Sequence, residues 1–304
     1  MHRRSFLKKL TGYSLGVMAG GLVLPNGIKA ELVKPFAELI SENRLNDEIR
    51  NRIVELKKDN RNLHVGELHC HSYYSDGAYS VRDLLLRSSL LGLDFLVITE
   101  HLTPGTYRLE SCLDSIKAQW NIFNRWNYGE MGPPAIYPAF EISTKEGHLI
   151  AVFPEDYFKP ERLREIRRYF SRFDHYSVPV ELTAGLIREM GAVSIVTHPD
   201  IKRSYPFGIS SGFVKEHLAG LVDGIEDMSA GHGYQKDFSA ETGLATIGSS
   251  DDHLNIILGT VVTSFDGTKH DNIIEAIRMR DTRAVRLTNS LDILFSPTKL
   301  FFNI

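Results

Sequence analysis

The stretch that most constrains this chain is residues 65–77, with the sequence V-G-E-L-H-C-H-S-Y-Y-S-D-G. An apolar, strand-like run leads into His69 and His71. Because alternate side chains of a strand share a face, both imidazoles should point one way and Cys70 the other. Two such imidazoles at a strand end suit a divalent metal ion, and Asp76 follows in a predicted tight turn. A metal site of this kind needs further ligands downstream.

From residue 63 onward, short apolar runs alternate with amphipathic segments. Strands are predicted near residues 95–99, 135–140, 149–153, 192–197, 224–226, 244–248 and 284–287, and helices near 80–91, 109–125, 161–170, 180–190 and 272–280. This alternation predicts parallel strands joined by helices, in a barrel or a doubly wound sheet. A chain of 304 residues with 42% hydrophobic content can form one large α/β domain or two smaller ones.

Residues able to bind metal recur at the ends of the predicted strands, where α/β barrels build their sites. His148 precedes its strand, and a hairpin after Glu141 could return it to the same rim. Any one of these residues has an ordinary explanation as a turn or strand-end residue, but together they predict a metal centre. The set comprises His69, His71, Asp76, His101, Glu141, His148, His198, Asp251 and His253.

The first thirty residues do not fit the α/β pattern. Residues 1–9 are basic, with Arg3 and Arg4 adjacent, and an apolar run at 13–24 follows, which is too short to span a membrane as a mature helix. The segment R-R-S-F-L-K resembles a twin-arginine export signal, with a small-residue cleavage site at Ala30. An ordinary secretory signal or an uncleaved anchor are the alternatives. We therefore expect a signal peptide at 1–30, a helical segment at 31–62, a metallohydrolase domain at 63–304 and a periplasmic location after passage through the twin-arginine export machinery.

Five motifs, taken in order, resemble those of the PHP (polymerase and histidinol phosphatase) family of metal-dependent phosphoesterases. They are L-H-C-H-S-Y-Y-S-D-G, I-T-E-H, A-F-E-I-S-T, T-H-P-D and G-S-S-D-D-H. The second motif carries Glu100 where the family more often has Asp. The resemblance implies an α/β fold of a particular kind, a distorted (β/α)7 TIM-like barrel of the PHP type, holding up to three metal ions.

The resemblance also implies how the ligands are shared among the ions. The first ion would take His69, His71, Glu141 and Asp251; the second His148 and His198, with Glu141 bridging; the third Asp76, His101 and His253. Zinc, manganese and iron all accept such mixed imidazole and carboxylate sets.

Charge counting favours a phosphoester substrate. Three divalent ions, three carboxylates and a bridging hydroxide leave a surplus of about +2, which suits a small anionic substrate. We therefore expect hydrolysis of phosphate mono- or diesters by metal-activated hydroxide. Lys145, Lys202, Arg203 and His232 are the residues that could bind the substrate.

Two other functions remain open. An amidohydrolase-type binuclear enzyme would cut a C–N or C–O bond without needing Asp76, His101 and His253 as a third ligand set. A non-catalytic exported metal-binding protein is the other alternative. The net charge of −3 gives no signature of nucleic-acid binding, and two cysteines, Cys70 and Cys112, provide no disulfide framework.

Overall fold

The computed structural model describes residues 44–102, 109–126, 132–170 and 176–288. The predicted signal peptide at 1–30 lies outside these ranges. Strands and helices alternate along the described chain, which confirms the mixed α/β fold. None of the helices in the described ranges has the length and apolar character needed to cross a membrane.

The first sheet is built around β1 (Leu63–Glu67), the strand that leads into the paired histidines. β1 pairs in parallel with β2 (Phe95–Leu96) and antiparallel with β11 (Val261–Asp266). The sheet order is β12-β11-β1-β2-β4, where β4 is Ala135–Ile136 and β12 is Arg283–Arg286.

The second sheet carries most of the remaining candidate ligands. Its order is β10-β8-β7-β6-β5-β3, with β9 paired to β8. β5 and β6 form an antiparallel hairpin that sets Ser143 opposite His148, which confirms the predicted return of His148 to the rim. The strands are β3 (His101–Leu102), β5 (Ala139–Ser143), β6 (His148–Val152), β7 (Val193–Val196), β8 (Gly224–Ser229), β9 (Tyr234–Gln235) and β10 (Ala245–Ser249).

The two sheets are linked rather than fused into a closed ring. The strand predicted at 95–99 is shorter than expected, because β2 covers only Phe95–Leu96, and β3 follows at His101–Leu102 in the other sheet. Single backbone hydrogen bonds span this junction, from Thr99 N to Cys70 O and from Glu141 N to Glu100 O. The structure therefore does not confirm one closed (β/α)7 barrel: the described residues form two sheets, joined by irregular pairing between residues 97 and 100.

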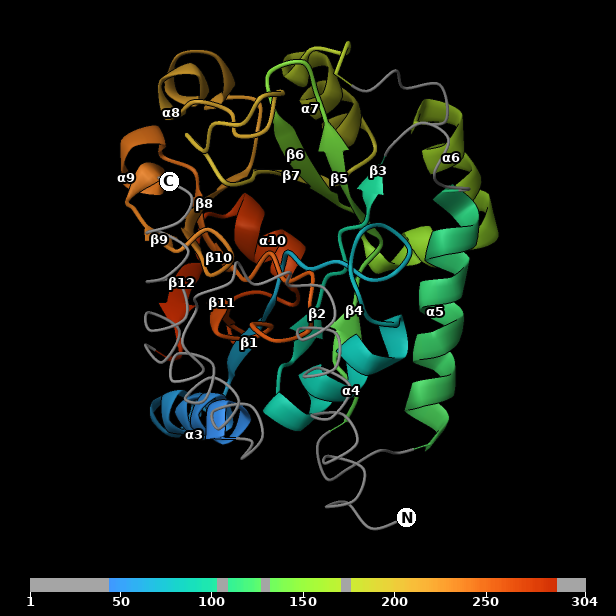
Figure 1. Cartoon of the computed structure of the whole chain (residues 1–304), viewed down its shortest axis with the longest axis vertical. Coiled ribbons are helices and arrows are strands. Elements are labelled where there is room, and N and C mark those ends of the chain that lie inside the picture. The colour runs from blue at the N-terminus through green and yellow to red at the C-terminus, as the bar shows by residue number, and fades with distance from the viewer. Residues whose placement is uncertain (1–43, 103–108, 127–131, 171–175, 289–304) are drawn as a thin grey trace, which may run out of the picture.

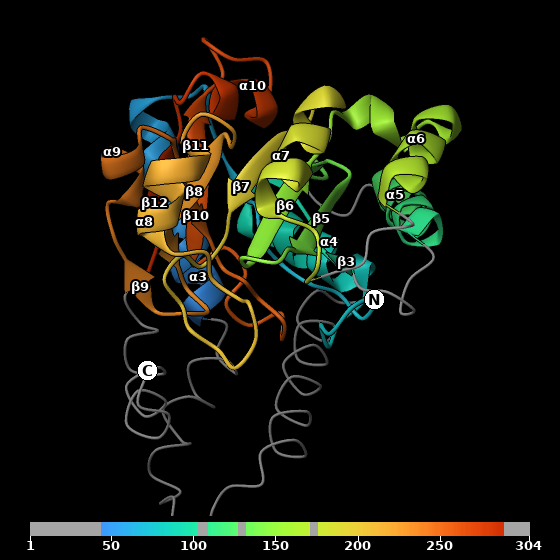
Figure 2. The same ribbon diagram turned by 90° about the horizontal axis from the view of Figure 1, so that it is seen from above.

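Helices cover the outside of the strands (Figure 1). Figure 2 shows the strands between α5 and α6 on one flank and α8 and α9 on the other. Ser80 caps α4 in a reciprocal capping box with Asp83. The helices are α3 (Arg44–Asp59), α4 (Val81–Leu91), α5 (Leu109–Trp126), α6 (Pro160–Phe170), α7 (Val180–Glu189), α8 (Ser211–Phe213), α9 (Phe238–Thr242) and α10 (Ile273–Arg278).

A compact apolar cluster between the strands fixes which end of the fold is left for polar residues. It includes Val193 at the start of β7 and Ile273 and Ile277 of α10. Fully burying an aliphatic side chain of this kind stabilises a fold by roughly 1.5–3 kcal/mol. α10 packs near the start of β7. The residues that follow the end of β7, beginning with Thr197 and His198, are therefore free to build a polar site.

Candidate metal centre

The paired histidines lie just beyond β1, on backbone that stays extended and paired. Asp251 N donates to His69 O at 2.9 Å, and His71 N donates to Asp252 O at 3.0 Å. This pairing places the exit of β10 beside the exit of β1. Cys70 points away from the histidines, with Sγ 3.5 Å from Val97 O. Asp251 thereby reaches the imidazoles although it lies 182 positions after His69 and 180 after His71 in the chain.

Four donor atoms surround one point at the end of β1. Nε2 of His69 lies 3.3 Å from Oε2 of Glu141 and 3.2 Å from Oδ1 of Asp251. Nε2 of His71 lies 3.4 Å and 3.3 Å from the same two oxygens. A tetrahedral ion with ligands about 2.1 Å away separates neighbouring donors by about 3.4 Å. These four residues, which we call the quartet, therefore have the spacing of a metal site.

The two imidazoles of the quartet are oriented so that each can bind a metal ion through Nε2. Both Nε2 atoms are buried and make no hydrogen bond. Nδ1 of His69 is held at 2.8 Å by Oε1 of Glu226. Nδ1 of His71 lies 3.3 Å from Ser75 Oγ, and that hydroxyl in turn donates to Glu100. Holding Nδ1 in this way leaves the Nε2 lone pair directed at the metal position.

A second group uses the other oxygen of Glu141. Oε1 lies 2.8 Å from Nδ1 of His148 and 2.9 Å from Nε2 of His198. The remaining ring nitrogens of both histidines are buried without a hydrogen bond. Because Oε2 faces the quartet and Oε1 faces this group, Glu141 has the geometry of a bridging ligand.

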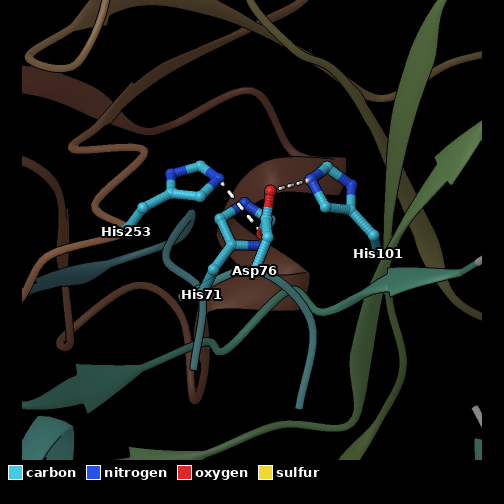
Figure 3. Close-up of side chains that lie close together, drawn as sticks. All are labelled: His71, Asp76, His101 and His253. Atoms are coloured by element: carbon cyan, nitrogen blue, oxygen red, sulfur yellow. Dashed lines mark ion pairs between the residues drawn. The ribbon is translucent and has the colours of Figure 1, made fainter. Parts of the chain in front are cut away.

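The third predicted set also converges. Asp76 Oδ2 lies 3.4 Å from Nε2 of His101, and Oδ1 lies 3.3 Å from Nε2 of His253. Figure 3 shows the two imidazoles on either side of the Asp76 carboxylate, with His71 beside it. The ring of His71 stacks on that of His253 at 4.2 Å, so this set adjoins the quartet. Gly77, which follows Asp76, lies so close to His71 O that a Cβ would sit 2.4 Å from it.

Burial and charge act against each other in the centre. Burial alone would raise the pKa of Glu141, yet the imidazoles of His101, His69 and His148 hold that pKa well below its usual value. Burial would likewise lower the pKa of His71, but the nearby carboxylates of Asp251 and Glu141 raise it to about 9.

In the metal-free protein the buried carboxylates therefore keep protons on neighbouring imidazoles. A divalent ion could replace those protons as the balancing charge. Burial lowers the pKa of His198 to about 4, so this imidazole is neutral and available as a ligand.

The predicted substrate residues divide into two kinds. Lys145, Lys202 and Arg203 are exposed, and the Arg203 guanidinium lies 5.3 Å from the ring of Phe207. His232 lies inside the centre, with Nε2 2.9 Å from Oδ2 of Asp251 and no hydrogen-bond geometry. His232 forms a group with His198 and Asp251 whose ligand atoms are close enough together to hold a metal ion.

Two buried carboxylates were missed by the sequence reasoning. Glu226 touches His69 and also accepts a hydrogen bond from His198 N at 2.7 Å. Glu67 accepts from the backbone of His69 and Ser250, and burial raises its pKa to about 7. Glu226 closed a strand in the prediction, so the strand-end rule that selected Glu141 would also have found it. Nothing in the local pattern marks Glu67, which looks like an ordinary residue of a strand.

Comparison with known proteins agrees with the sequence motifs. A model of the PHP-associated family matches residues 235–282, which include Asp251 and His253. The resemblance to the PHP family is thereby confirmed. Among curated proteins, none matches the sequence closely enough to be reported as a relative.

Three solved structures align with this chain, each with a TM-score below 0.5. A two-domain protein from Bacteroides vulgatus, described as containing a predicted PHP-like metal-dependent phosphoesterase, is 19% identical with a TM-score of 0.46, over 74% of this chain and 65% of that one. A putative metal-dependent phosphoesterase from Bifidobacterium adolescentis is 15% identical with a TM-score of 0.42, over 62% and 87%. The lesion-specific endonuclease Q of Pyrococcus furiosus is 16% identical with a TM-score of 0.47, over 71% and 56%. This chain thus covers less than two thirds of the first and third of these proteins.

Proposed function

We propose that this protein is a metal-dependent phosphoesterase that hydrolyses phosphate mono- or diesters at a centre of two or three divalent ions. The observation that carries the proposal is the quartet, in which two buried Nε2 atoms without hydrogen bonds face two carboxylate oxygens at 3.2 to 3.4 Å. Hydrogen bonding within the protein leaves these lone pairs unused. A divalent cation would satisfy all four donors at once.

The three groups of donors define where ions would be held. The quartet would hold the first ion, Glu141 with His148 and His198 the second, and Asp76 with His101 and His253 the third. Zinc, manganese or iron bound there would supply Lewis-acid polarisation of a phosphoryl oxygen and lower the pKa of a water molecule.

The chain's own residues would orient these ligands and receive the anion. Glu226 and the Glu100–Ser75 pair hold the His69 and His71 rings in the orientation that exposes Nε2. Arg203 supplies a cation at the edge of the centre for a phosphate oxygen that the ions leave free. Glu226 adds a negative charge to the count made from the sequence, so the positive surplus is smaller than about +2.

The third group favours a phosphoesterase over a binuclear amidohydrolase. Asp76, His101 and His253 come from three separate segments and meet next to the quartet. A two-ion enzyme acting on a C–N or C–O bond would have no use for this additional set. A phosphate ester, with several anionic oxygens, can engage a third cation.

Two further proposals extend this assignment. The linked sheets would represent a distorted form of the seven-stranded PHP barrel, opened at the junction near residue 97. The basic segment with Arg3 and Arg4 would direct export through the twin-arginine machinery to the periplasm. Fractionation of cells expressing the full chain, compared with an Arg3→Lys, Arg4→Lys variant, tests the second proposal through loss of the periplasmic pool.

The function is tested with protein stripped by chelator and reloaded with Zn²⁺, Mn²⁺ or Fe²⁺. p-Nitrophenyl phosphate, its bis ester, a single-stranded oligonucleotide and a panel of amides and lactones cover the competing classes. We expect phosphoester hydrolysis that depends on added metal and is lost in His69→Ala. His217→Ala, which changes an exposed histidine, is the matched control. Turnover of amides or lactones alone, or no turnover by protein shown to hold its ions, would reject the proposal.

A further inference from the structure

An ordered loop borders the second ligand group on its outer side. Residues 199–208 leave β7 after His198 and close on themselves: Asp200 N donates to Ile209 O and Gly208 N donates to Ile201 O, both at 3.1 Å. Phe207 O accepts from His148 N at 2.7 Å, so the loop is tied directly to the start of β6. The backbone of the loop therefore has a fixed position relative to the imidazoles.

The inner aromatic residue of the loop packs on the metal ligands. The ring of Phe207 stacks on that of His198 with centroids 4.0 Å apart and planes at 12°. It also contacts the ring of His148, at 4.9 Å between centroids. Phe207 thus forms an apolar wall behind both candidate ligands.

Two outer rings are left facing solvent at this same place. Tyr205 is 48% exposed and lies 6.5 Å from the His148 ring, with the two planes at 29°. Tyr176 is 42% exposed and meets Tyr205 nearly at a right angle, with centroids 6.2 Å apart. We call Tyr176 and Tyr205 the tyrosine corner, a name that refers here only to this pair and not to the motif of the same name in β-sandwich proteins. A right-angled pair of exposed rings offers one face and one edge to a third flat group.

The backbone holds the corner in a costly conformation. Tyr176 has a φ of 63°, in the left-handed region that favours glycine. Its N–H donates to Ser143 O at 3.1 Å, which anchors it to the end of β5, next to the candidate ligand Glu141. A bulky residue kept in this region beside a site points to a use for its position.

We propose that the tyrosine corner binds a planar aromatic group of the substrate, so that the enzyme prefers phosphoesters bearing an aryl group or a nucleobase over aliphatic ones. This inference rests on the proposed phosphoesterase function. The phosphate would lie against the ions and Arg203, and the flat group would pack on Tyr205 with its edge toward Tyr176. Stacking on an aromatic side chain contributes enough to change affinity about tenfold.

The test compares substrates that differ in aromatic character but have similar leaving alcohols. Benzyl phosphate is compared with cyclohexylmethyl phosphate, and adenosine 5′-monophosphate with ribose 5-phosphate; methyl diesters replace these monoesters if only diesters react. Wild-type protein should show a kcat/KM about tenfold higher for the aromatic member of at least one pair. The pair that shows it tells whether the ring is a simple aryl group or a nucleobase.

Variants assign the preference to the corner. Tyr205→Ala and Tyr176→Ala should reduce kcat/KM about tenfold for the aromatic substrate and less than twofold for the aliphatic one. Tyr205→Phe should keep the preference, because the ring rather than the hydroxyl carries it. Tyr169→Ala, on α6 and 41% exposed, is the matched control and should change neither.

Binding separates this inference from the function on which it rests. Calorimetry of metal-loaded protein with benzylphosphonate and cyclohexylmethylphosphonate needs no turnover. If benzylphosphonate binds more tightly than cyclohexylmethylphosphonate and Tyr205→Ala abolishes the difference, the aromatic site at the corner is supported, whether or not any ester is hydrolysed. Absence of hydrolysis in that case would reject only the phosphoesterase function. Equal binding and equal kcat/KM for the two members of each pair would reject the proposal that the corner binds an aromatic group. A preference that survives in both alanine variants would reject it too. Neither result would contradict the phosphoesterase function.

Discussion

Nδ1 of His69 lies 2.8 Å from Oε1 of Glu226, and both side chains are fully buried. The same carboxylate accepts a hydrogen bond from Ser249 through Oε1 and from His198 N through Oε2. Glu226 therefore joins β8 to the exits of β1, β7 and β10. Burial would raise the pKa of Glu226, but the nearby His69 lowers it, so the group is an anion.

Replacing Glu226 by Gln should weaken metal binding without unfolding the protein. An amide has one acceptor oxygen where the carboxylate uses two, so either His69 or His198 N loses its partner. Changes of this kind around a metal ligand typically reduce affinity about 10- to 100-fold. Competition with a fluorescent chelator measures the effect, with the exposed Glu161→Gln as control. Unchanged affinity in Glu226→Gln would show that the His69–Glu226 contact does not orient a ligand.

Asp76→Ala should remove one bound ion and leave the quartet's ion in place. Asp76 is the carboxylate that His101 and His253 share, whereas the quartet uses Glu141 and Asp251. Because half of the Asp76 side chain is exposed, the fold should tolerate its loss. Metal content per chain, measured by plasma mass spectrometry after dialysis, should fall by about one ion, a number that follows from one ion per ligand group. An equal metal content in the variant and the wild-type protein would show that Asp76, His101 and His253 do not hold an ion.

Metal binding near neutral pH should release protons. The pKa of His71 is raised to about 9 in the metal-free protein, so at a pH below this value the imidazole carries a proton that the ion must displace. The apparent affinity should therefore rise with pH, about tenfold per unit for each displaced proton, and level off above about pH 9. Calorimetry in two buffers of different ionisation enthalpy counts the protons. Heats independent of the buffer would contradict the protonated state assigned to His71.

Gly208→Ala should disturb the loop that carries Tyr205, one of the two residues of the tyrosine corner. A Cβ at Gly208 would lie 2.4 Å from His198 O and 2.7 Å from Ile201 O, so the backbone would have to move. Crowding of this kind costs roughly 1–3 kcal/mol of unfolding free energy. Thermal unfolding measures the cost. Gly212→Ala is the control, because its Cβ would meet nothing within 4 Å, and equal midpoints for the two variants would show that the loop is not tightly packed.

Periodicity and spacing predicted the parts of the centre that obey local rules. His69 and His71 share a face because strand geometry requires it, and the β5–β6 hairpin was needed to explain His148. The sequence did not predict that the strand at 95–99 shortens to Phe95–Leu96 before the chain enters the other sheet at His101, since the pairing of residues 97–100 is set by partners elsewhere in the chain. The sequence could not predict that His232 lies beside Asp251, because its loop has no pattern of its own. Its contact with Asp251 arises only when β8 and β10 lie side by side.

The central claim is that the quartet holds a divalent cation, and anomalous diffraction from crystals of the zinc- or manganese-loaded protein tests it most directly. We predict a peak at the metal's absorption edge that lies about 2.0–2.3 Å from Nε2 of His69, Nε2 of His71, Oε2 of Glu141 and Oδ1 of Asp251. Metal ions bound at full occupancy elsewhere in the protein, with no anomalous peak between these four atoms, would contradict the claim that the quartet holds a cation.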